Sequence, residues 1–265
     1  MGGELIAATA TAGYQPAGAL EATTTGLHRL VDLEIPFPVF DWNGIALKDL
    51  IHNRHHVGAE TWPAFTAITG LSLYGREIAV VGFGPVGQGV AQRARELGAH
   101  VTVVDRDPVR LVQARHQGCR VGNFDEAVRN ASVVVTATGF DGVVGAEQIE
   151  RLADGAILMN VGHSHREIDV DWLNQHAHAN LRRHIERFDV NGRRVYLLNH
   201  GSLLNLAAGL GDGAPQLFDP FLSIMLLGLH AILEGRLADM PAGVQRYPRE
   251  LETRVARALN EGTAN

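Results

Sequence analysis

The sequence predicts an α/β fold, a doubly wound parallel sheet flanked by helical segments from both ends of the chain. Short apolar runs rich in β-branched residues alternate with helical patterns through the middle of the chain, as parallel strands buried on both faces do. One such run, 78–81, leads into Gly-Phe-Gly-Pro-Val-Gly at 82–87, and a helical pattern follows at 90–97. A second run, 101–104, ends at Asp105. This succession predicts a βαβ unit of the Rossmann type.

The glycines of this unit indicate a bound dinucleotide. Gly82 permits a tight turn, Gly84 lets a pyrophosphate approach the backbone, and Gly87 lets helix and strand pack closely. The N–H groups at the start of the helix face the phosphates. Asp105 can accept hydrogen bonds from the adenosine ribose, which favours NAD, while the adjacent Arg106 leaves NADP as an alternative. The other interpretation is a glycine-rich turn in an unrelated α/β protein.

The totals exclude several classes of protein. A net charge of −6 gives no reason to expect nucleic acid or an anionic membrane as a partner. A single cysteine, Cys119, excludes an intrachain disulfide framework and fits a reducing cytoplasm, and no Cys/His cluster has zinc spacing. The start of the chain lacks the pattern of a signal peptide, and the most apolar run, 221–233, is too short to span a bilayer. We therefore expect a soluble, cytoplasmic protein without a metal.

Three segments are predicted along the chain. Residues 72–200 form the nucleotide-binding domain, and residues 1–71 and 201–265 flank it. Because the nucleotide domain is inserted between the flanking segments, we expect them to pack together as a second body, although they are too short to form a large substrate domain. In the nucleotide domain, the strands predicted at 133–136 and 156–160 end in polar sequence, and carboxyl ends of parallel strands form the ligand crevice.

Three further stretches carry candidate functional residues. The predicted helix 47–56 contains Lys48 and His52 at a spacing of four, so they can share a face, although that face could also be simply solvated. Three threonines at 23–25 precede a glycine and a predicted helix, where they could bind a ligand or serve as an ordinary N-cap cluster. His163 follows the strand at 156–160, where it could act as an acid or base or contact the nicotinamide.

Longer motifs follow one another in a fixed order along nearly the whole chain. They are Gly2-Gly3-Glu4-Leu5, Glu21-Ala22-Thr23-Thr24-Thr25-Gly26, the Lys48…Asn53 helix, Gly82–Gly89, Thr136-Ala137-Thr138-Gly139, Asn160-Val161-Gly162-His163, Glu167-Ile168-Asp169-Val170, Gly201-Ser202-Leu203-Leu204-Asn205-Leu206 and Gly243-Val244…Pro248. This order resembles the S-adenosylhomocysteine hydrolase (adenosylhomocysteinase) family.

The resemblance implies a hydrolase of one-carbon metabolism, in the S-adenosylmethionine cycle, that splits S-adenosyl-L-homocysteine into adenosine and homocysteine. Members keep NAD tightly bound and use it to oxidise the ribose 3′-hydroxyl to a ketone. The ketone acidifies the C4′ proton, so that the 5′-thiol leaves by elimination, water adds, and the stored hydride reduces the ketone again. The cofactor makes a poor leaving group depart easily, while side chains move the protons.

The resemblance also implies roles for single residues. Lys48 matches a lysine that assists removal of the 3′-hydroxyl proton, Asn53 an asparagine beside it, and His163 a histidine near the sugar and the nicotinamide. His52 stands where the family has an aspartate and is a fourth catalytic candidate. The implied cofactor contacts are Thr23, Thr24, Thr25, Gly82, Gly84, Pro85, Val86, Gly87, Asp105, Arg106, Thr136, Ala137, Thr138, Val161, Gly162, His163 and Asn205.

The departures from the family are as informative. Ala22 replaces a glutamate, His52 an aspartate, and Asp212 a histidine that follows Gly211, while Met1 falls at an active-site aspartate. We also expect an upstream segment with another histidine, and a C-terminal tail that reaches a neighbour's NAD, to be missing. These changes leave two alternatives to the hydrolase: a divergent NAD-dependent nucleoside or sugar oxidoreductase or epimerase, and a non-catalytic NAD-binding relative. We expect a nucleoside-type substrate for the catalytic interpretations, and a homo-oligomer.

Overall fold

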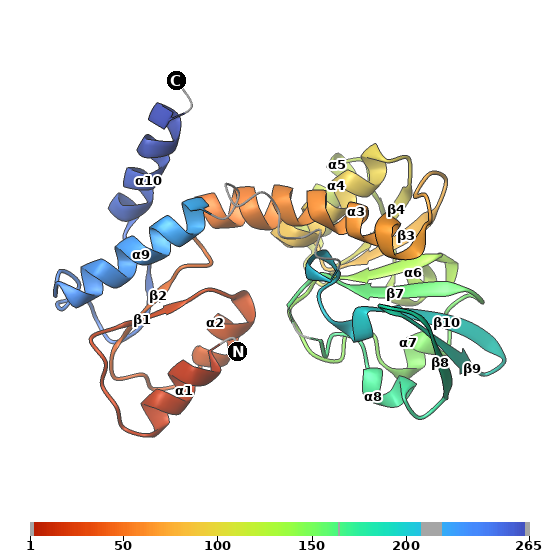
Figure 1. Cartoon of the computed structure of the whole chain (residues 1–265), viewed down its shortest axis with the longest axis horizontal. Helices are drawn as coiled ribbons and strands as arrows, with labels where there is room; N and C mark the ends of the chain where they lie inside the picture. Colours follow the sequence, from red (N-terminus) through yellow and green to blue (C-terminus); the bar gives the residue numbers. More distant parts are fainter. Residues whose placement is uncertain (1–2, 164, 208–218, 263–265) are drawn as a thin grey trace. The chain divides into compact units, whose positions relative to one another are not determined.

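The structure is a computed structural model that describes residues 3–163, 165–207 and 219–262. It divides into two compact units, a larger one of residues 53–212 and a smaller one of residues 1–52 together with 213–265 (Figure 1). The larger unit begins well before residue 72 because helix α3 (Val57–Thr69) packs along α4 (Pro85–Glu96). Among the described residues, no helix is both long and apolar enough to cross a membrane.

The larger unit is built on an eight-stranded sheet with the strand order β5-β4-β3-β6-β7-β10-β9-β8. The first six strands in that order are parallel, and β9 and β8 add an antiparallel edge. The strands are β3 (Glu77–Val81), β4 (His100–Val104), β5 (Arg120–Val121), β6 (Val133–Thr136), β7 (Ala156–Asn160), β8 (Ala177–Arg182), β9 (Ile185–Val190) and β10 (Arg193–Leu198). The predicted α/β class with a Rossmann-type parallel sheet is confirmed.

Helices cover both faces of this sheet, which explains why its central strands are predominantly apolar. In β3, Ile78 and Val80 contribute to one apolar core and Ala79 and Val81 to the other, as the two-residue period of a strand requires. Besides α3 and α4, the helices are α5 (Pro108–His116), α6 (Phe124–Asn130), α7 (Ala146–Ile149) and α8 (Val170–Leu173), with two 3₁₀ turns, η2 (Asn199–Gly201) and η3 (Leu204–Leu206).

The antiparallel hairpin β8–β9 was not predicted from the sequence. Strand β8 lies at the edge of the sheet and its side chains are almost all exposed, so it lacks the apolar pattern by which a strand is recognised. Charged and other polar side chains are usual on such an edge, where they discourage pairing with other chains.

The smaller unit contains a three-stranded parallel sheet of β1 (Ala19–Glu21), β2 (Pro38–Asp41) and β11 (Gly243–Arg246), in the order β1-β2-β11. Strand β11 comes from the C-terminal segment, so the two ends of the chain share one sheet. The described helices of this unit are α1 (Glu4–Thr11), α2 (Thr24–Leu30), α9 (Asp219–Leu233) and α10 (Arg249–Gly262). The helical segments predicted at the chain ends are present, but the small sheet between them was not predicted, because strands of three or four residues carry too little periodicity to be recognised.

The segment Leu47–His56, predicted as an ordinary helix, is a π-helix (η1). In a π-helix each backbone N–H bonds to the carbonyl five residues earlier, which widens the turn; such turns are rare and are frequently found at functional sites. Lys48 and His52 are therefore less than one turn apart on this element.

Candidate cofactor and catalytic sites

The glycine loop between β3 and α4 has the three distinct environments that a dinucleotide site requires. Gly82 has a φ of 96°, and a Cβ there would lie 2.7 Å from the Ala137 carbonyl oxygen. A Cβ on Gly87 would lie 1.9 Å from the Gly82 carbonyl oxygen, so helix and turn touch through it. A Cβ on Gly84, in contrast, would have no atom outside the adjacent residues closer than 3.9 Å. The residue also provides no side-chain cap for α4. The backbone at Gly84 is thus open to a phosphate, as the residues of this loop predict.

Asp105, at the end of β4, is held in place by the loop that it serves. One carboxylate oxygen, Oδ2, accepts a hydrogen bond of 2.6 Å from the Phe83 N–H, and Oδ1 accepts one of 2.8 Å from the Asp107 N–H. The Arg110 guanidinium lies 3.6 Å from Oδ2, and the Asp105 side chain is only 7% exposed. Each oxygen keeps acceptor capacity for a ribose hydroxyl. Arg106, the residue that leaves NADP as the alternative cofactor, follows Asp105 directly in the chain.

Glu167 is fully buried and connects the loops that follow β6 and β7. Its carboxylate accepts hydrogen bonds from the Thr138 N–H (3.0 Å), the Thr138 hydroxyl (2.9 Å), the Gly139 N–H (2.8 Å) and the His163 N–H (3.1 Å). It also lies so close to Gly162 that a Cβ there would be 1.9 Å from Oε1. The predicted cofactor residues Thr138, Gly162 and His163 are therefore positioned by one carboxylate. In the sequence Glu167 belongs to one of the motifs, but no local pattern there indicates this role.

A buried amide fixes the carboxyl ends of three strands. The Asn160 Oδ1 accepts from the Thr136 hydroxyl (3.3 Å) and the Gly162 N–H (2.8 Å), and its Nδ2 donates to the Gly201 carbonyl (3.0 Å). Thr136 is fully buried, so its hydroxyl supports this network. The network places the ends of β6, β7 and β10 at one edge of the sheet. The remaining predicted cofactor contacts lie beside it or at the start of α4; they are Ala137, Val161, Pro85 and Val86.

The turn after β10 is strained and leads to Asn205. Three successive residues, Asn199, His200 and Gly201, have φ of 51°, 53° and 73°. The left-handed region is unfavourable for residues other than glycine, and such strain is concentrated at functional sites. The Asn199 Nδ2 donates to the Leu203 carbonyl at 3.0 Å, which anchors the start of η3.

Asn205, on η3, is buried, and its Oδ1 has no hydrogen-bond partner among the described residues. A buried acceptor without a donor costs about 1–3 kcal/mol, so such a group usually meets a ligand or an ordered water. The nicotinamide carboxamide carries N–H donors of the required kind. This acceptor, the open backbone at Gly84 and the positioned Asp105 together fit NAD.

In the smaller unit, Thr23 is the N-cap of α2. Its hydroxyl oxygen accepts a hydrogen bond of 2.9 Å from the Gly26 N–H, while its own N–H and hydroxyl donate to Glu21 at 2.8 and 2.7 Å. The capping interpretation is thus confirmed for Thr23, and Thr25 is buried. Ala22, where the resemblance implies a glutamate, packs against an apolar cluster.

Lys48 lies in a polar chain that includes a residue missed by the sequence analysis. Its ammonium donates a hydrogen bond of 2.8 Å to the Asn43 Oδ1, and the Asn43 Nδ2 donates one of 2.9 Å to the Thr24 hydroxyl. Its Nζ also lies 5.8 Å from the centre of the Trp42 ring. Asn43 stands in a stretch without periodicity, so its nearness to Lys48 in the chain was the only available signal.

Burial lowers the pKa of Lys48 to about 8, against the opposing influence of Asp49, Asp41 and Glu21. A lysine with such a pKa is partly neutral near physiological pH and can accept a proton. Lys48 is also the only lysine in a chain whose other strong bases are all arginine. Because arginine cannot act as a base at neutral pH, this single exception supports a chemical role for the position.

Two further catalytic candidates, His52 and Asn53, lie on η1. The His52 ring packs edge-on against Phe221 of α9, with ring centres 4.7 Å apart. Asn53 follows in the same π-helix and is assigned to the larger unit. Met1, Gly211 and Asp212, three positions that entered the family resemblance, lie outside the described residues.

Residues 64–211 match the family model for the NAD-binding domain of S-adenosyl-L-homocysteine hydrolase. The S-inosyl-L-homocysteine hydrolase of Methanosarcina mazei is 38% identical over 247 residues, which cover 91% of this chain and 59% of that protein. The chain belongs to the S-adenosyl-L-homocysteine hydrolase family. Its cofactor is NAD, in agreement with the prediction.

Other relatives agree with this assignment. The adenosylhomocysteinase of Thermotoga maritima is 38% identical over 255 residues, 91% of this chain and 61% of that protein, so the chain spans about three-fifths of the length of these family members. Among solved structures, a dipicolinate synthase chain from Bacillus halodurans has a TM-score of 0.54 at 18% identity, covering 77% of this chain and 60% of that one. At this identity the likeness concerns the fold alone.

The Asp105 geometry predicts the cofactor preference. In the Asp105→Asn variant we expect NAD to bind about tenfold more weakly, which corresponds to about 1.4 kcal/mol, and the ratio of NADP to NAD affinity to rise. The amide is a weaker acceptor for ribose hydroxyls and does not repel a 2′-phosphate. Isothermal titration calorimetry with both cofactors measures this. Asp107→Asn is the matched control, and an unchanged NAD affinity in Asp105→Asn would contradict the assignment.

Glu167→Gln tests whether one carboxylate positions the loops that follow β6 and β7. The amide would present N–H groups to N–H donors that now bond to the carboxylate, so we expect the larger unit to lose about 3 kcal/mol of unfolding free energy. NAD affinity should fall with it. Urea unfolding and NAD titration measure both effects. The exposed Glu126→Gln serves as control, and equal stability of the two variants would argue against the role of Glu167.

Proposed function

We propose that this protein hydrolyses the thioether of a nucleosidyl-homocysteine, in the parent reaction S-adenosyl-L-homocysteine to adenosine and homocysteine through a 3′-keto intermediate. The observation that carries the proposal is the single lysine, Lys48, with its pKa lowered to about 8 in a family whose domain binds NAD. One of the relatives is named for the inosyl compound. Both nucleosides are therefore candidate substrates.

The residues of the chain would divide the work as follows. Bound NAD supplies a hydride acceptor for the sugar carbon that bears the 3′-hydroxyl. Lys48 would accept the proton of that hydroxyl, and Asn43 would hold the Lys48 amine in one orientation through its 2.8 Å hydrogen bond. Asp105 and Asn205 would bind the two ends of the dinucleotide. The candidates for contacts with the sugar are His163 and Asn53.

A second candidate function is supported by Ala22 and His52. The resemblance implies carboxylates at both positions, and here one is a methyl group in an apolar cluster and the other an imidazole packed on Phe221. Without carboxylates at these two positions, steps that need a carboxylic acid there would have none, and the redox half of the chemistry would remain. The alternative is therefore an NAD-dependent nucleoside or sugar oxidoreductase or epimerase.

The deciding experiment adds adenosine, inosine and the two corresponding homocysteine thioethers to the NAD-loaded protein. We expect absorbance at 340 nm to rise with a nucleoside, and free thiol to appear with a thioether. The rate of reduction should increase with pH through about 8, because the neutral form of Lys48 accepts the proton.

Three outcomes separate the two candidate functions. Reduction together with thiol release supports the hydrolase, whereas reduction without thiol release supports the oxidoreductase. No absorbance change at 340 nm with any of the four compounds would refute both. Lys48→Met should bind NAD normally and lose reduction by at least a hundredfold; Arg115→Met, an exposed base of the larger unit, is the matched control.

We also propose that the protein is a homo-oligomer that associates through α9. Leu222, Leu226, Leu229 and Leu233 are 45, 61, 40 and 84% exposed, at the four-three-four spacing of a helix-pairing seam. The opposite face of α9 is buried in the smaller unit. A second copy offers the same seam, and a self-complementary stripe suits a two-fold interface.

Light scattering coupled to size exclusion tests this association. The wild type should run as a dimer or larger, and the Leu226→Glu/Leu229→Glu variant as a smaller species, because charge in the seam opposes its burial. Leu181→Glu, on the exposed strand β8, is the control. A monomeric wild type, or an unchanged mass in the double variant, would sink the proposal.

A further inference from the structure

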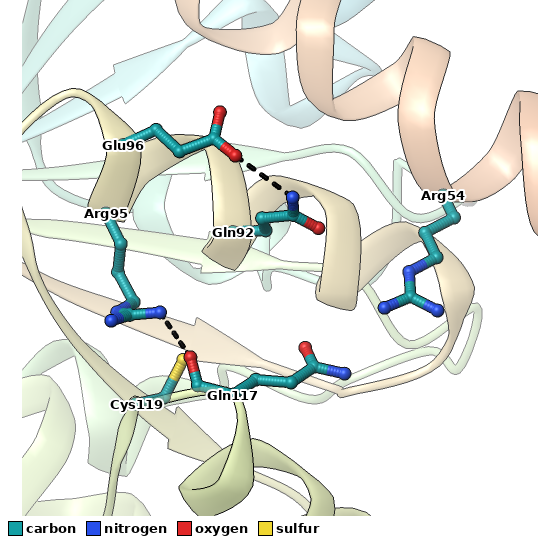
Figure 2. Close-up of a pocket in the computed structure, with 6 residues that line it drawn as sticks. All are labelled: Arg54, Gln92, Arg95, Glu96, Gln117 and Cys119. Carbon is teal, nitrogen blue, oxygen red and sulfur yellow. Dashed lines mark hydrogen bonds between the residues drawn. The ribbon is translucent and has the colours of Figure 1, made fainter.

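The larger unit contains a cavity of about 390 Å³ that is lined by none of the predicted cofactor or catalytic residues. Figure 2 shows its lining, which is polar and comes from η1, from the second half of α4 and from the turn before β5. The lining residues are Arg54, Gln92, Arg95, Glu96, Gln117 and Cys119.

This cavity lies at the amino ends of the parallel strands, whereas the glycine loop lies at their carboxyl ends. The loop occupies the start of α4, whereas Gln92, Arg95 and Glu96 lie in the last two turns of that helix. A helix of 12 residues is about 18 Å long, so the two places are separated by most of that length. Gln117 and Cys119 precede β5, at the amino end of a parallel strand. The cavity is thus separate from the predicted cofactor residues at the carboxyl ends of the strands.

Two of its charged groups are committed to partners within the chain. Arg95 donates to the Gln117 carbonyl, which closes the turn before β5 (Figure 2). Glu96 accepts hydrogen bonds from the Arg93 guanidinium (2.8 Å) and the Gln92 amide (3.0 Å), and Arg93 holds the pKa of Glu96 below its usual range. Glu96 therefore stays ionised and is neutralised by Arg93.

Arg54 differs from these two groups. Within the described part of the chain its Nε is buried without a hydrogen-bond partner. Its backbone is held firmly, since a Cβ on Gly89 would lie 1.5 Å from the Arg54 carbonyl oxygen. Figure 2 shows its side chain reaching from the helix into the cavity toward the Gln117 carboxamide. The Arg54 guanidinium thus enters a cavity in which the one lining carboxylate, Glu96, is already paired with Arg93.

We propose that this cavity binds a small organic oxyanion, with a phosphate or carboxylate group on Arg54 and a polar body against the amides of Gln92 and Gln117. A guanidinium presents a planar fork of donors that matches both kinds of oxyanion. The volume is in the range of small-molecule sites and exceeds what a bare ion needs. The nearby end of α4 exposes carbonyl groups that disfavour an anion, so binding depends on Arg54 rather than on the helix.

The test uses the full chain saturated with NAD, so that no probe can occupy the pyrophosphate site. Inorganic phosphate, glycerol 3-phosphate and succinate are titrated at constant ionic strength against chloride, with calorimetry and the side-chain amide NMR signals of Gln92 and Gln117 as readouts. We expect at least one probe to bind saturably and to shift both amide signals. A response to the phosphates alone identifies a phosphate group, and a response to succinate alone identifies a carboxylate.

The variants decide whether Arg54 carries the binding. Arg54→Gln should weaken the best probe at least tenfold, Arg54→Lys should weaken it less, and NAD affinity should stay unchanged in both. Arg115→Gln removes an equal charge from an exposed position on α5 and should bind as the wild type does. No saturation with any of the three probes, or equal affinity in Arg54→Gln and wild type, would overturn the proposal; thermal melts establish that each variant is folded.

Discussion

The loops that follow β6 and β7 depend on the buried carboxylate of Glu167. Four donors from the loops after β6 and β7 converge on it, and without a carboxylate these backbone N–H groups would lose their acceptor. Bonds to an ionised acceptor are stronger than neutral ones, and several on one group cooperate. Gly162 has no side chain because the same carboxylate occupies the space beside it. Glu167 thus leaves room only for a glycine at position 162. The loops that hold Thr138 and His163 are coupled through the same carboxylate.

Around this interaction, further hydrogen bonds fix the strand ends and loops that carry the predicted NAD contacts. Asp105 is tied to the glycine loop, Asn160 joins three strand ends, and the strained turn after β10 delivers Asn205. Each connection fixes a group before any ligand arrives, which lowers the cost of ordering on binding. The exception is the Asn205 oxygen, left without a donor among the described residues. This edge of the sheet is therefore pre-organised for a ligand that donates a hydrogen bond to the Asn205 oxygen.

Sequence reasoning succeeded where local pattern and function coincide. The run from β3 to Asp105 was recognised because strand period, glycine spacing and helix pattern agree along it. Reasoning failed where the partner is distant in the sequence or the stretch has no periodicity: Glu167 meets Thr138 across 29 positions, and Asn43 bonds to Thr24 across 19 positions and to Lys48 from a stretch without a pattern. The small parallel sheet of the chain ends was missed because β2 and β11 pair residues about 200 positions apart and are too short to show alternation. The π-helical form of Leu47–His56 was missed because helical periodicity does not distinguish a four-residue from a five-residue hydrogen-bond ladder.

The two lost carboxylates bear on the chemistry of Lys48. Burial lowers its pKa, and the acids Asp49, Asp41 and Glu21 counteract that effect. A glutamate at position 22, beside Glu21, or an aspartate at position 52, within one turn of Lys48, would add negative charge to the same side of the balance. Negative charge favours the ammonium form. Ala22 and His52 therefore leave the amine less protonated at neutral pH than the residues implied by the family pattern would. The two positions thus supply no carboxylic acid, while a less protonated amine accepts a proton more readily, which supports Lys48 as the base in the oxidative step of the proposed function.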